Sequence, residues 1–339
     1  MNKIFAIIDN MKNIDILAIG DVVIDAFIKL KDAETHCKLN HEDCELCVRY
    51  GDKVPYESVE VCYAVGNSAN AAVSASRLGL NSALYSYVGG DQNGKECIAS
   101  LEKDGVDTSY VHVENDNKTN YHYVLWYEVD RTILVKHEHF KYNFENMETP
   151  KWIYLSSLGE NTLDFQMQIM DFVESHPEIK LAFQPGTFQI KMGKDAPERI
   201  YKKTEVFFCN VEEAQKILGE SSRDLPTLLK GINVLGPKIV VITDGFDGAY
   251  AFDSGTGESW FMPVYPHTPF ERTGAGDAYA STLISCLAMG KDLKEAMSFA
   301  PINAMSVTQQ VGAQKGLLKK EKIEEYLAKA PENYKLKKI

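Results

Sequence analysis

The sequence has no long hydrophobic run, and no stretch approaches the roughly 18 consecutive apolar residues of a membrane-spanning helix. Its N-terminal apolar stretch is too short and too charged for a signal peptide. No dense Lys/Arg cluster occurs before the short tail KLKKI, and 48 acidic against 36 basic residues give a formal charge of -12. Because a nucleic-acid backbone repels such a chain, we expect a cytoplasmic protein that binds neither membranes nor nucleic acids.

Cysteine is scarce, and the seven cysteines form an odd number. Without a secretion signal, they predict reduced thiols rather than a disulfide framework. Four of them, Cys37, Cys44, Cys47 and Cys62, lie close together. Cys44 and Cys47 have the Cys-x-x-Cys spacing of a zinc half-site, with His41 three residues earlier. A second such pair is missing, so ordinary thiols on a surface segment are the alternative.

Internal repeats, low-complexity segments and Pro/Ser-rich linkers are also absent, so we expect residues 1–339 to form a single domain. What is present is an alternation of apolar runs with segments of helical period. The runs that predict buried strands are 15–20, 82–89, 151–157, 179–185, 205–210 and 238–245. The helical segments are 67–79, 94–105, 163–176 and 211–219. This alternation predicts a mostly parallel sheet covered by helices on both faces.

Two regions interrupt the alternation. Residues 22–64 contain strand-like stretches with little helical pattern, and residues 120–135 contain two β-rich runs around a charged turn at 128–131. Together they predict a small antiparallel sheet. Because ligands bind at the carboxyl ends of parallel strands, a sheet beside that edge can serve as a lid.

The stretch ERTGAGDAYASTLISCLAMG, residues 271–290, joins a glycine-rich turn to an apolar segment of helical period. A helix that starts near Ala275 would direct the amides of Gly274, Ala275 and Gly276 at one point. Free amides at a helix N-terminus bind anions, and glycine permits close approach of a phosphate. The stretch therefore predicts an anion hole.

Asp277 follows this turn at once, in the first turn of the predicted helix. A carboxylate repels a bound phosphate, so its useful role beside an anion hole is to accept a proton from an attacking hydroxyl. The pair therefore indicates phosphoryl transfer to an alcohol. The alternative is that Asp277 only stabilises the helix dipole and that the glycines only form a turn.

The stretch resembles the C-terminal signature of the ribokinase-like (PfkB-type) carbohydrate kinases, in which the Asp is the catalytic base. Five further segments resemble motifs of that family in the same order: AIGDVVIDAFIKL, AVGNSANAAVSASRLGL, YSYVGGDQNGKECIASLEKDGVDTSYV, NVEEAQKILG and VVITDGFDGAYAFD. The matches run from about Asp15 to Ala313. The resemblance implies a three-layer α/β/α sandwich with a mostly parallel central sheet, a small β lid, and transfer of the ATP γ-phosphate to a sugar hydroxyl.

The resemblance also implies a substrate site formed by Asp25, Gly66, Asn70 and Arg131. The carboxylate of Asp25 and the amide of Asn70 offer acceptors and donors suited to vicinal hydroxyls. The chain has Val65-Gly66 where the family has a Gly-Gly pair, so the approach of the backbone to the sugar can differ. For Arg131, a solvated turn arginine is the alternative.

For the nucleotide, the resemblance implies a cleft lined by Asn210, Glu213, Thr243 and Gly245. Glu213 would act through ordered water on the Mg²⁺ that accompanies ATP, since Mg²⁺ usually retains several waters. The alternatives are that Asn210 only caps the following helix and that Thr243 is only a strand end. The chain has Pro301 where relatives often place an Asn that contacts adenine.

Before the anion hole the chain departs from the family. Relatives commonly have Asp-Thr-Thr, and where they use K⁺ or another monovalent cation the acidic residue helps to form its site; this chain has Glu271-Arg272-Thr273. Glu271 and Thr273 are thus candidates for a monovalent-cation site. Arg272 is a candidate to contact a phosphate or to replace part of the effect of that cation, so a K⁺ requirement is left open.

Three functions compete at this point. A neutral-sugar kinase of the ribokinase or fructokinase type is favoured by Asp25, Asn70 and the acidic composition. A nucleoside kinase would need a pocket for the base, which Tyr121, Tyr123 and Trp126 could form. The third candidate is a catalytically inert protein that binds a sugar or nucleotide and regulates a partner. Because the lid often forms the dimer interface in relatives, we expect a homodimer.

Overall fold

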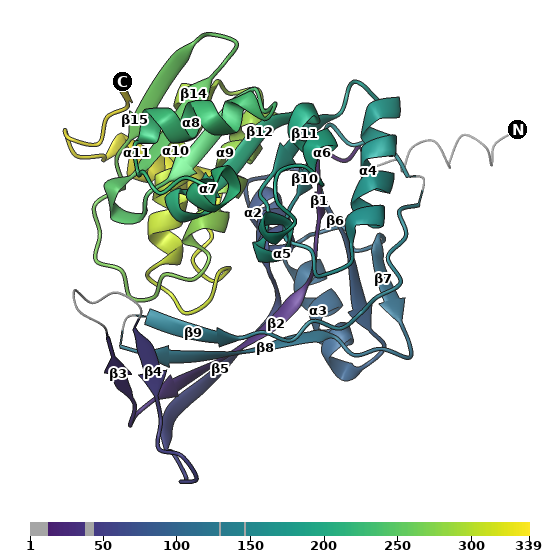
Figure 1. Ribbon diagram of the computed structural model, residues 1–339, viewed down its shortest axis with the longest axis vertical. Helices are drawn as coiled ribbons and strands as arrows, with labels where there is room; N and C mark the ends of the chain where they lie inside the picture. Colours follow the sequence, from purple (N-terminus) through teal and green to yellow (C-terminus); the bar gives the residue numbers. More distant parts are fainter. Residues whose placement is uncertain (1–12, 38–43, 129, 146) are drawn as a thin grey trace, which may run out of the picture.

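The computed structural model describes residues 13–37, 44–128, 130–145 and 147–339, and the statements below concern these residues. They form a ten-stranded sheet in the order β16-β15-β14-β13-β12-β11-β10-β1-β6-β7 (Figure 1). Seven strands run parallel: β13 (Ile239–Thr243), β12 (Thr204–Asn210), β11 (Lys180–Phe183), β10 (Trp152–Leu155), β1 (Ile16–Ile19), β6 (Ser82–Gly89) and β7 (Val111–Glu114). Antiparallel strands extend one edge: β14 (Ala249–Asp253), β15 (Glu258–Met262) and β16 (Lys337–Lys338).

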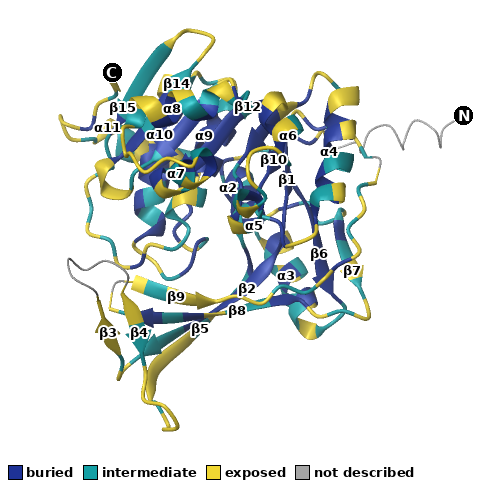
Figure 2. Ribbon diagram, in the orientation of Figure 1, coloured by how far each residue is buried: buried dark blue, intermediate teal, exposed yellow. Residues whose placement is uncertain are grey.

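Helices cover both faces of this sheet. Along β1, Ile16 and Ala18 belong to one apolar core and Leu17 and Ile19 to the other, as the two-residue period of a strand requires. The first face carries α2 (Asn67–Arg77), α3 (Gln92–Lys103), α9 (Ala275–Ala288), α10 (Leu293–Val307) and α11 (Lys320–Ala328). The second carries α4 (Leu163–Ser175), α5 (Thr187–Lys191), α6 (Glu198–Lys203), α7 (Val211–Leu218) and α8 (Leu225–Val234). Figure 2 shows the buried strands between the half-buried helices, which confirms the predicted three-layer α/β/α sandwich.

The predicted helix ends are set by glycine. Gly79, Gly105 and Gly219 follow α2, α3 and α7, with φ values of 93°, 76° and 70°. Only glycine adopts this left-handed conformation without a steric penalty, so it closes a helix and turns the chain toward the next strand.

The lid is a separate four-stranded sheet in the order β5-β2-β8-β9, below the main sheet in Figure 1. Its strands are β2 (Val23–Leu30), β5 (Tyr56–Val65), β8 (Asn120–Tyr127) and β9 (Asp130–Leu134). The prediction of an antiparallel sheet is wrong for one pair, because β2 and β8 are parallel. The reason is continuity: β2 directly follows β1, β8 directly follows β7, and β1 and β7 run in the same direction in the main sheet.

The cysteine-rich part of the lid forms a hairpin of β3 (Glu34–His36) and β4 (Glu45–Cys47). Cys37 and Cys44 are joined by a disulfide, so the prediction that all cysteines are reduced is wrong for this pair. The predicted zinc half-site is also wrong, because the Cys44 sulfur is bonded to Cys37 and is not a thiolate ligand beside Cys47. His41 lies outside the described residues. Among those described, no group of three or more side chains is arranged to hold a metal ion.

No helix in the described ranges combines the length and the hydrophobicity of a transmembrane segment.

The disulfide gives a direct test. Protein purified without reductant should yield a Cys37–Cys44 linked peptide on digestion, and thiol titration in denaturant should find the five free cysteines, Cys47, Cys62, Cys97, Cys209 and Cys286. Elemental analysis should find substoichiometric zinc. Cys44→Ser, as the control, should add the Cys37 thiol to the titration. Seven titratable thiols together with one zinc per chain would instead restore the metal site.

Candidate active site

A polar cavity lies between the main sheet and the lid, at the carboxyl ends of five parallel strands. Each strand contributes one lining residue there: Asp21 after β1, Ser157 after β10, Gln184 after β11, Asn210 at the end of β12 and Thr243 at the end of β13. This is where an open α/β sheet binds ligands, because the strand ends and the loops after them converge.

A second, apolar cavity adjoins the first. Both are lined by Thr243, Arg272, Ala275, Gly276 and Tyr279. The rest of its wall is mostly apolar and includes Phe246, Ala249, Met262, Pro263, Val264, Pro301, Ala304 and Met305. The start of α9 therefore stands at the boundary between a polar and an apolar compartment.

The glycine turn at this boundary has the predicted form. Helix α9 begins at Ala275, and Gly274 before it has a φ of 80°. A Cβ on Gly274 would come within 2.3 Å of the Ala313 Cβ. The position therefore requires glycine both for its positive φ and for lack of space. A Cβ on Gly276 would meet nothing within 4 Å, which leaves open space above the first turn. The first amides of a helix have no partner inside the helix, although the Ala275 amide donates to the Arg272 carbonyl at 3.4 Å.

The Asp277 carboxylate is enclosed by side-chain amides. Asn67 Nδ2 donates to its Oδ1 at 2.9 Å, Asn70 Nδ2 to its Oδ2 at 2.8 Å, and Gln184 Nε2 to its Oδ1 at 3.1 Å. Loss of contact with water raises the pKa of Asp277, while the bonds from Asn70 and Gln184 and the charge of Arg131 oppose that rise. The result is a carboxylate with a raised pKa, a better proton acceptor than an ordinary aspartate.

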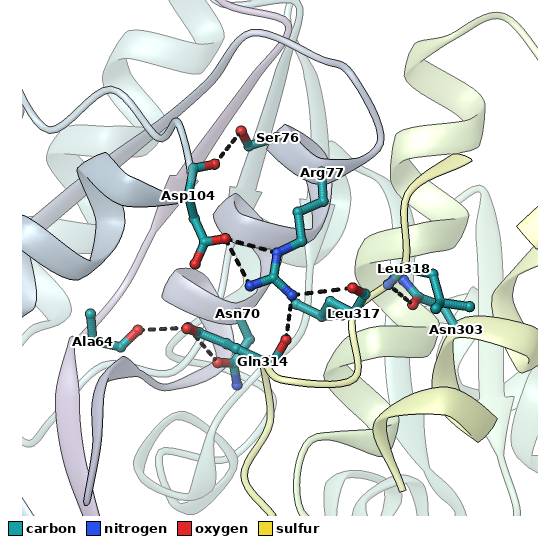
Figure 3. Close-up of polar contacts among 9 residues, drawn as sticks. All are labelled: Ala64, Asn70, Ser76, Arg77, Asp104, Asn303, Gln314, Leu317 and Leu318. Atoms are coloured by element: carbon teal, nitrogen blue, oxygen red, sulfur yellow. Dashed lines mark hydrogen bonds and ion pairs between the residues drawn. The ribbon is translucent and has the colours of Figure 1, made fainter. Parts of the chain in front are cut away.

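Other residues orient these amides. Gln314 Nε2 donates to the Asn70 Oδ1 at 3.0 Å and to the Ala64 carbonyl at 2.7 Å (Figure 3). This contact fixes which end of the Asn70 amide points at Asp277. The hydroxyl of Tyr154 donates in the same way to the Gln184 Oε1.

The segment that carries Gln314 is held against α2 by Arg77. Its guanidinium donates to the carbonyls of Gln314 and Leu317 at 2.6 and 3.1 Å and pairs with Asp104 at 2.7 Å (Figure 3). Leu318 N donates to Asn303 Oδ1 at 2.8 Å, which ties the same segment to α10. These contacts hold the segment after α10 in the position from which Gln314 reaches Asn70.

The predicted substrate residues lie in the polar cavity. Asp25, Gly66, Asn70 and Arg131 all line it. His122, on the paired strand, places Nδ1 3.4 Å from the Asp25 Oδ1. Arg131 is therefore not the solvated turn arginine of the alternative interpretation.

Asp21 is a carboxylate that the sequence analysis missed. It is 5% exposed and accepts hydrogen bonds from the Tyr142 hydroxyl and the Gly159 amide, both at 2.6 Å. The Nδ1 of His137 lies 3.3 Å from the same carboxylate. Asp21 and His137 both line the polar cavity beside Asp25.

The residues predicted to bind the nucleotide lie where the polar cavity meets the apolar cavity. Asn210 and Glu213 form a capping box on α7: the Asn210 side chain accepts from Glu213 N at 2.8 Å, and Glu213 Oε2 accepts from Asn210 N at 2.9 Å. The capping role is thus confirmed, and both residues also line the polar cavity. Loss of contact with water raises the pKa of Glu213, and the nearby Asp277 charge adds to the rise. Thr243 and Gly245 line the apolar cavity.

The residues before the glycine turn contact one another and the lid. Glu271 Oε1 accepts from the amide and the hydroxyl of Thr273 at 2.8 and 2.6 Å. Arg272 lies over the Phe246 ring at 4.7 Å. The guanidinium nearest to Glu271 is that of Arg131, with Nε 3.9 Å from Oε1. Arg131 is therefore the arginine paired with Glu271, whereas Arg272 lines both cavities.

The structure brings together all of the motif residues except the cysteines, and it adds contacts that the motifs do not contain. Asn67, Gln184, Gln314, Asp21 and His122 were missed. For Asp21 and Gln184 a signal was present, because a polar residue directly after a buried parallel strand lies at the ligand edge of the sheet.

Comparison with known proteins agrees with the family resemblance found in the sequence. The sequence model of the pfkB family carbohydrate kinases matches residues 28–320. Similar curated proteins include a nucleoside kinase of Methanothermobacter thermautotrophicus, 28% identical over 74% of this chain and 79% of the relative, and a ribokinase of Bacillus subtilis, 26% identical over 78% and 87%.

Among solved structures, the fold resembles that of Arabidopsis thaliana ribokinase complexed with ribose and ATP, with a TM-score of 0.77, 17% identity, and coverage of 93% of this chain and 99% of the other. It also resembles the Methanocaldococcus jannaschii nucleoside kinase, with a TM-score of 0.75, 19% identity, and coverage of 94% and 99%. The chain therefore belongs to the pfkB family of carbohydrate kinases and is a phosphotransferase.

Proposed function

We propose that this protein transfers the γ-phosphate of ATP to a hydroxyl of a neutral sugar, as a kinase of the ribokinase or fructokinase type. The observation that carries the proposal is the position of Asp277. Its carboxylate stands at the N-terminus of α9, where a polar cavity with hydrogen-bonding side chains meets an apolar cavity.

The reaction follows from this placement. A sugar in the polar cavity binds through Asp25 and Asn70, and one hydroxyl faces Asp277. As that hydroxyl oxygen attacks the γ-phosphorus, its proton passes to the carboxylate, the bond between the γ-phosphorus and the bridging oxygen breaks, and ADP leaves. The amides of Gly274, Ala275 and Gly276 stabilise the negative charge on the transferring group. Closure of the lid excludes water, which would otherwise accept the phosphate.

In this proposal the nucleotide base occupies the apolar cavity beside Pro301, and Asn210, Thr243 and Gly245 border the phosphates. The residues fit Mg²⁺ held mainly by phosphates and water, because the capping box uses one oxygen of Glu213 and the described residues form no metal-binding cluster. Bound Mg²⁺ would neutralise phosphate charge, and Glu213 would orient one of its waters.

A nucleoside kinase is the second candidate, and a side pocket favours it. This pocket shares Val135, His137 and Phe188 with the polar cavity and extends it toward Glu138, His139, Tyr142 and Glu160. A base attached to the sugar could lie there against Phe188. The base pocket expected from Tyr121, Tyr123 and Trp126 does not lie in the polar cavity, because none of the three lines it. Tyr121 and Tyr123 flank His122, which faces the cavity, so they point to the other face of the strand, and Trp126 packs against Phe270.

A substrate panel tests both candidates. With MgATP, an ADP-release assay over pentoses, hexoses and nucleosides should give turnover with a neutral sugar. Turnover confined to nucleosides would replace the first candidate by the second. No turnover with any member would contradict the proposal and favour an inert binding protein.

Asp277→Asn should lower kcat by about 10²–10⁴-fold, because the amide cannot accept the proton. ATP binding measured by calorimetry should change little, since the anion-hole amides remain. Turnover equal to that of the unmodified protein would overturn the role of Asp277 as the base.

The raised pKa of Asp277 predicts the pH dependence. The base acts deprotonated, so kcat/KM should fall as pH falls through its pKa, at a higher pH than for an ordinary aspartate. Gln184→Leu removes a hydrogen bond that lowers this pKa, so the acidic limb of the profile should move to higher pH. The exposed Gln92→Leu is the matched control and should leave the profile in place. An unshifted limb in Gln184→Leu would contradict the assignment.

A homodimer through the lid is also part of the proposal. The outer face of the lid exposes Tyr123, Leu134, Val59 and Val61 at 49%, 51%, 48% and 38%, and such patches favour protein contacts. Light scattering should give twice the mass of one chain, and Tyr123→Lys should shift it toward the monomer. Val234→Lys, at an exposed apolar position on α8, is the control and should remain dimeric. A monomeric parent protein would exclude this interface.

A further inference from the structure

Three consecutive residues before the anion hole contact the β8–β9 hairpin of the lid. The Phe270 ring meets that of Trp126 edge to face at 5.3 Å between centroids. The Glu271 carboxylate lies 3.9 Å from the Arg131 guanidinium, and Arg272 lies 3.9 Å from Asp130. We call residues 270–272 the approach segment.

Glu271 is the unusual member of this segment, because it is a buried carboxylate with a residue exposure of 1%. Its Oε1 binds Thr273 twice, whereas its Oε2 is buried without a hydrogen-bond partner among the described residues. A buried charge needs a compensating charge nearby. Within the described ranges, Arg131 is its one ion-pair partner, and the Arg131 Nε is likewise buried without a hydrogen bond.

The position of Glu271 controls the anion hole. The backbone amides of Phe270 and Glu271 donate to the Thr308 carbonyl at 2.7 and 3.0 Å, which fixes the segment against the end of α10. The carboxylate then holds both the amide and the hydroxyl of Thr273, directly before Gly274. Anything that moves Glu271 moves the turn whose amides receive the phosphate.

A monovalent cation does not fit this arrangement. A cation on the Glu271 Oε2 would place a second positive charge beside the Arg131 guanidinium, which already pairs with this carboxylate. We propose that Arg131 itself supplies that charge, so that it acts as a positioning residue and the protein needs no K⁺. The proposal rests on the proposed kinase function. It extends that function by making a lid residue responsible for the geometry of the anion hole.

Cation dependence is the first test. The parent protein should give the same kcat in KCl, NaCl and tetramethylammonium chloride at equal ionic strength. Arg131→Gln should lose about 10²-fold in kcat in tetramethylammonium chloride, because the anion hole is displaced, and KCl should restore part of the loss. Arg131→Lys keeps a positive charge and should show a smaller loss with no K⁺ response.

Thermal unfolding provides a readout that does not depend on turnover. KCl, compared with tetramethylammonium chloride, should raise the Tm of Arg131→Gln, since a ligand that binds the folded state stabilises it. The parent Tm should be the same in both salts. The double variant Arg131→Gln/Glu271→Gln should lose the K⁺ response, because the carboxylate that binds the ion is gone. Lys136→Gln, which removes an exposed positive charge shortly after β9, is the control and should behave like the parent.

K⁺ activation of the parent protein would overturn the inference, as would an Arg131→Gln variant that shows no K⁺ response in either kcat or Tm. In the latter case Arg131 would act on the substrate alone. If the parent turns over no substrate, the kinase proposal fails first, and the Tm comparison still decides the role of Arg131.

Discussion

The site depends on a partly buried carboxylate that is surrounded by neutral donors. Asn67, Asn70 and Gln184 donate to Asp277, and hydrogen bonds to a charged group contribute about 1.5–3 kcal/mol each. A direct salt bridge would stabilise the charge more strongly and would make the aspartate a poor base. Amide donors hold the charge and leave the pKa raised. This requirement fixes the distances between α2, the end of β11 and the start of α9.

Much of the fold could be predicted from local pattern. Buried parallel strands are short apolar runs, and left-handed glycines mark helix ends such as Gly219, so the alternation was readable. The helical period of α10 is hard to see in the sequence, because the helix is apolar on most sides and contains Pro301. The parallel pairing of β2 with β8 was missed because it depends on the directions of β1 and β7, which no local pattern contains.

The parts of the site that come from one contiguous motif could be predicted. Contacts between residues far apart in the sequence could not. The turn at residues 274–277 holds its glycines and its aspartate in four consecutive positions, so its form followed from spacing. The orienting contacts of Gln184 and Gln314 join segments far apart in the chain and have no local signature. Spacing also suggested zinc at Cys44, although its sulfur is bonded to Cys37, seven residues away. Arg272 and Arg131 could be distinguished only once the lid was placed over the approach segment.

The sequence separations in the site have a consequence for how the protein is made. The bond from Asn70 to Asp277 spans 207 residues, and the bond from Gln314 to Asn70 spans 244. A domain generally folds as a unit during synthesis, and α2 cannot contact Asp277 until α9 has left the ribosome. A nascent chain that contains only β1, α2 and β6 therefore lacks both the Asp277 carboxylate and the Gln314 side chain that orients Asn70. The candidate site is complete only after residue 314 has been synthesised.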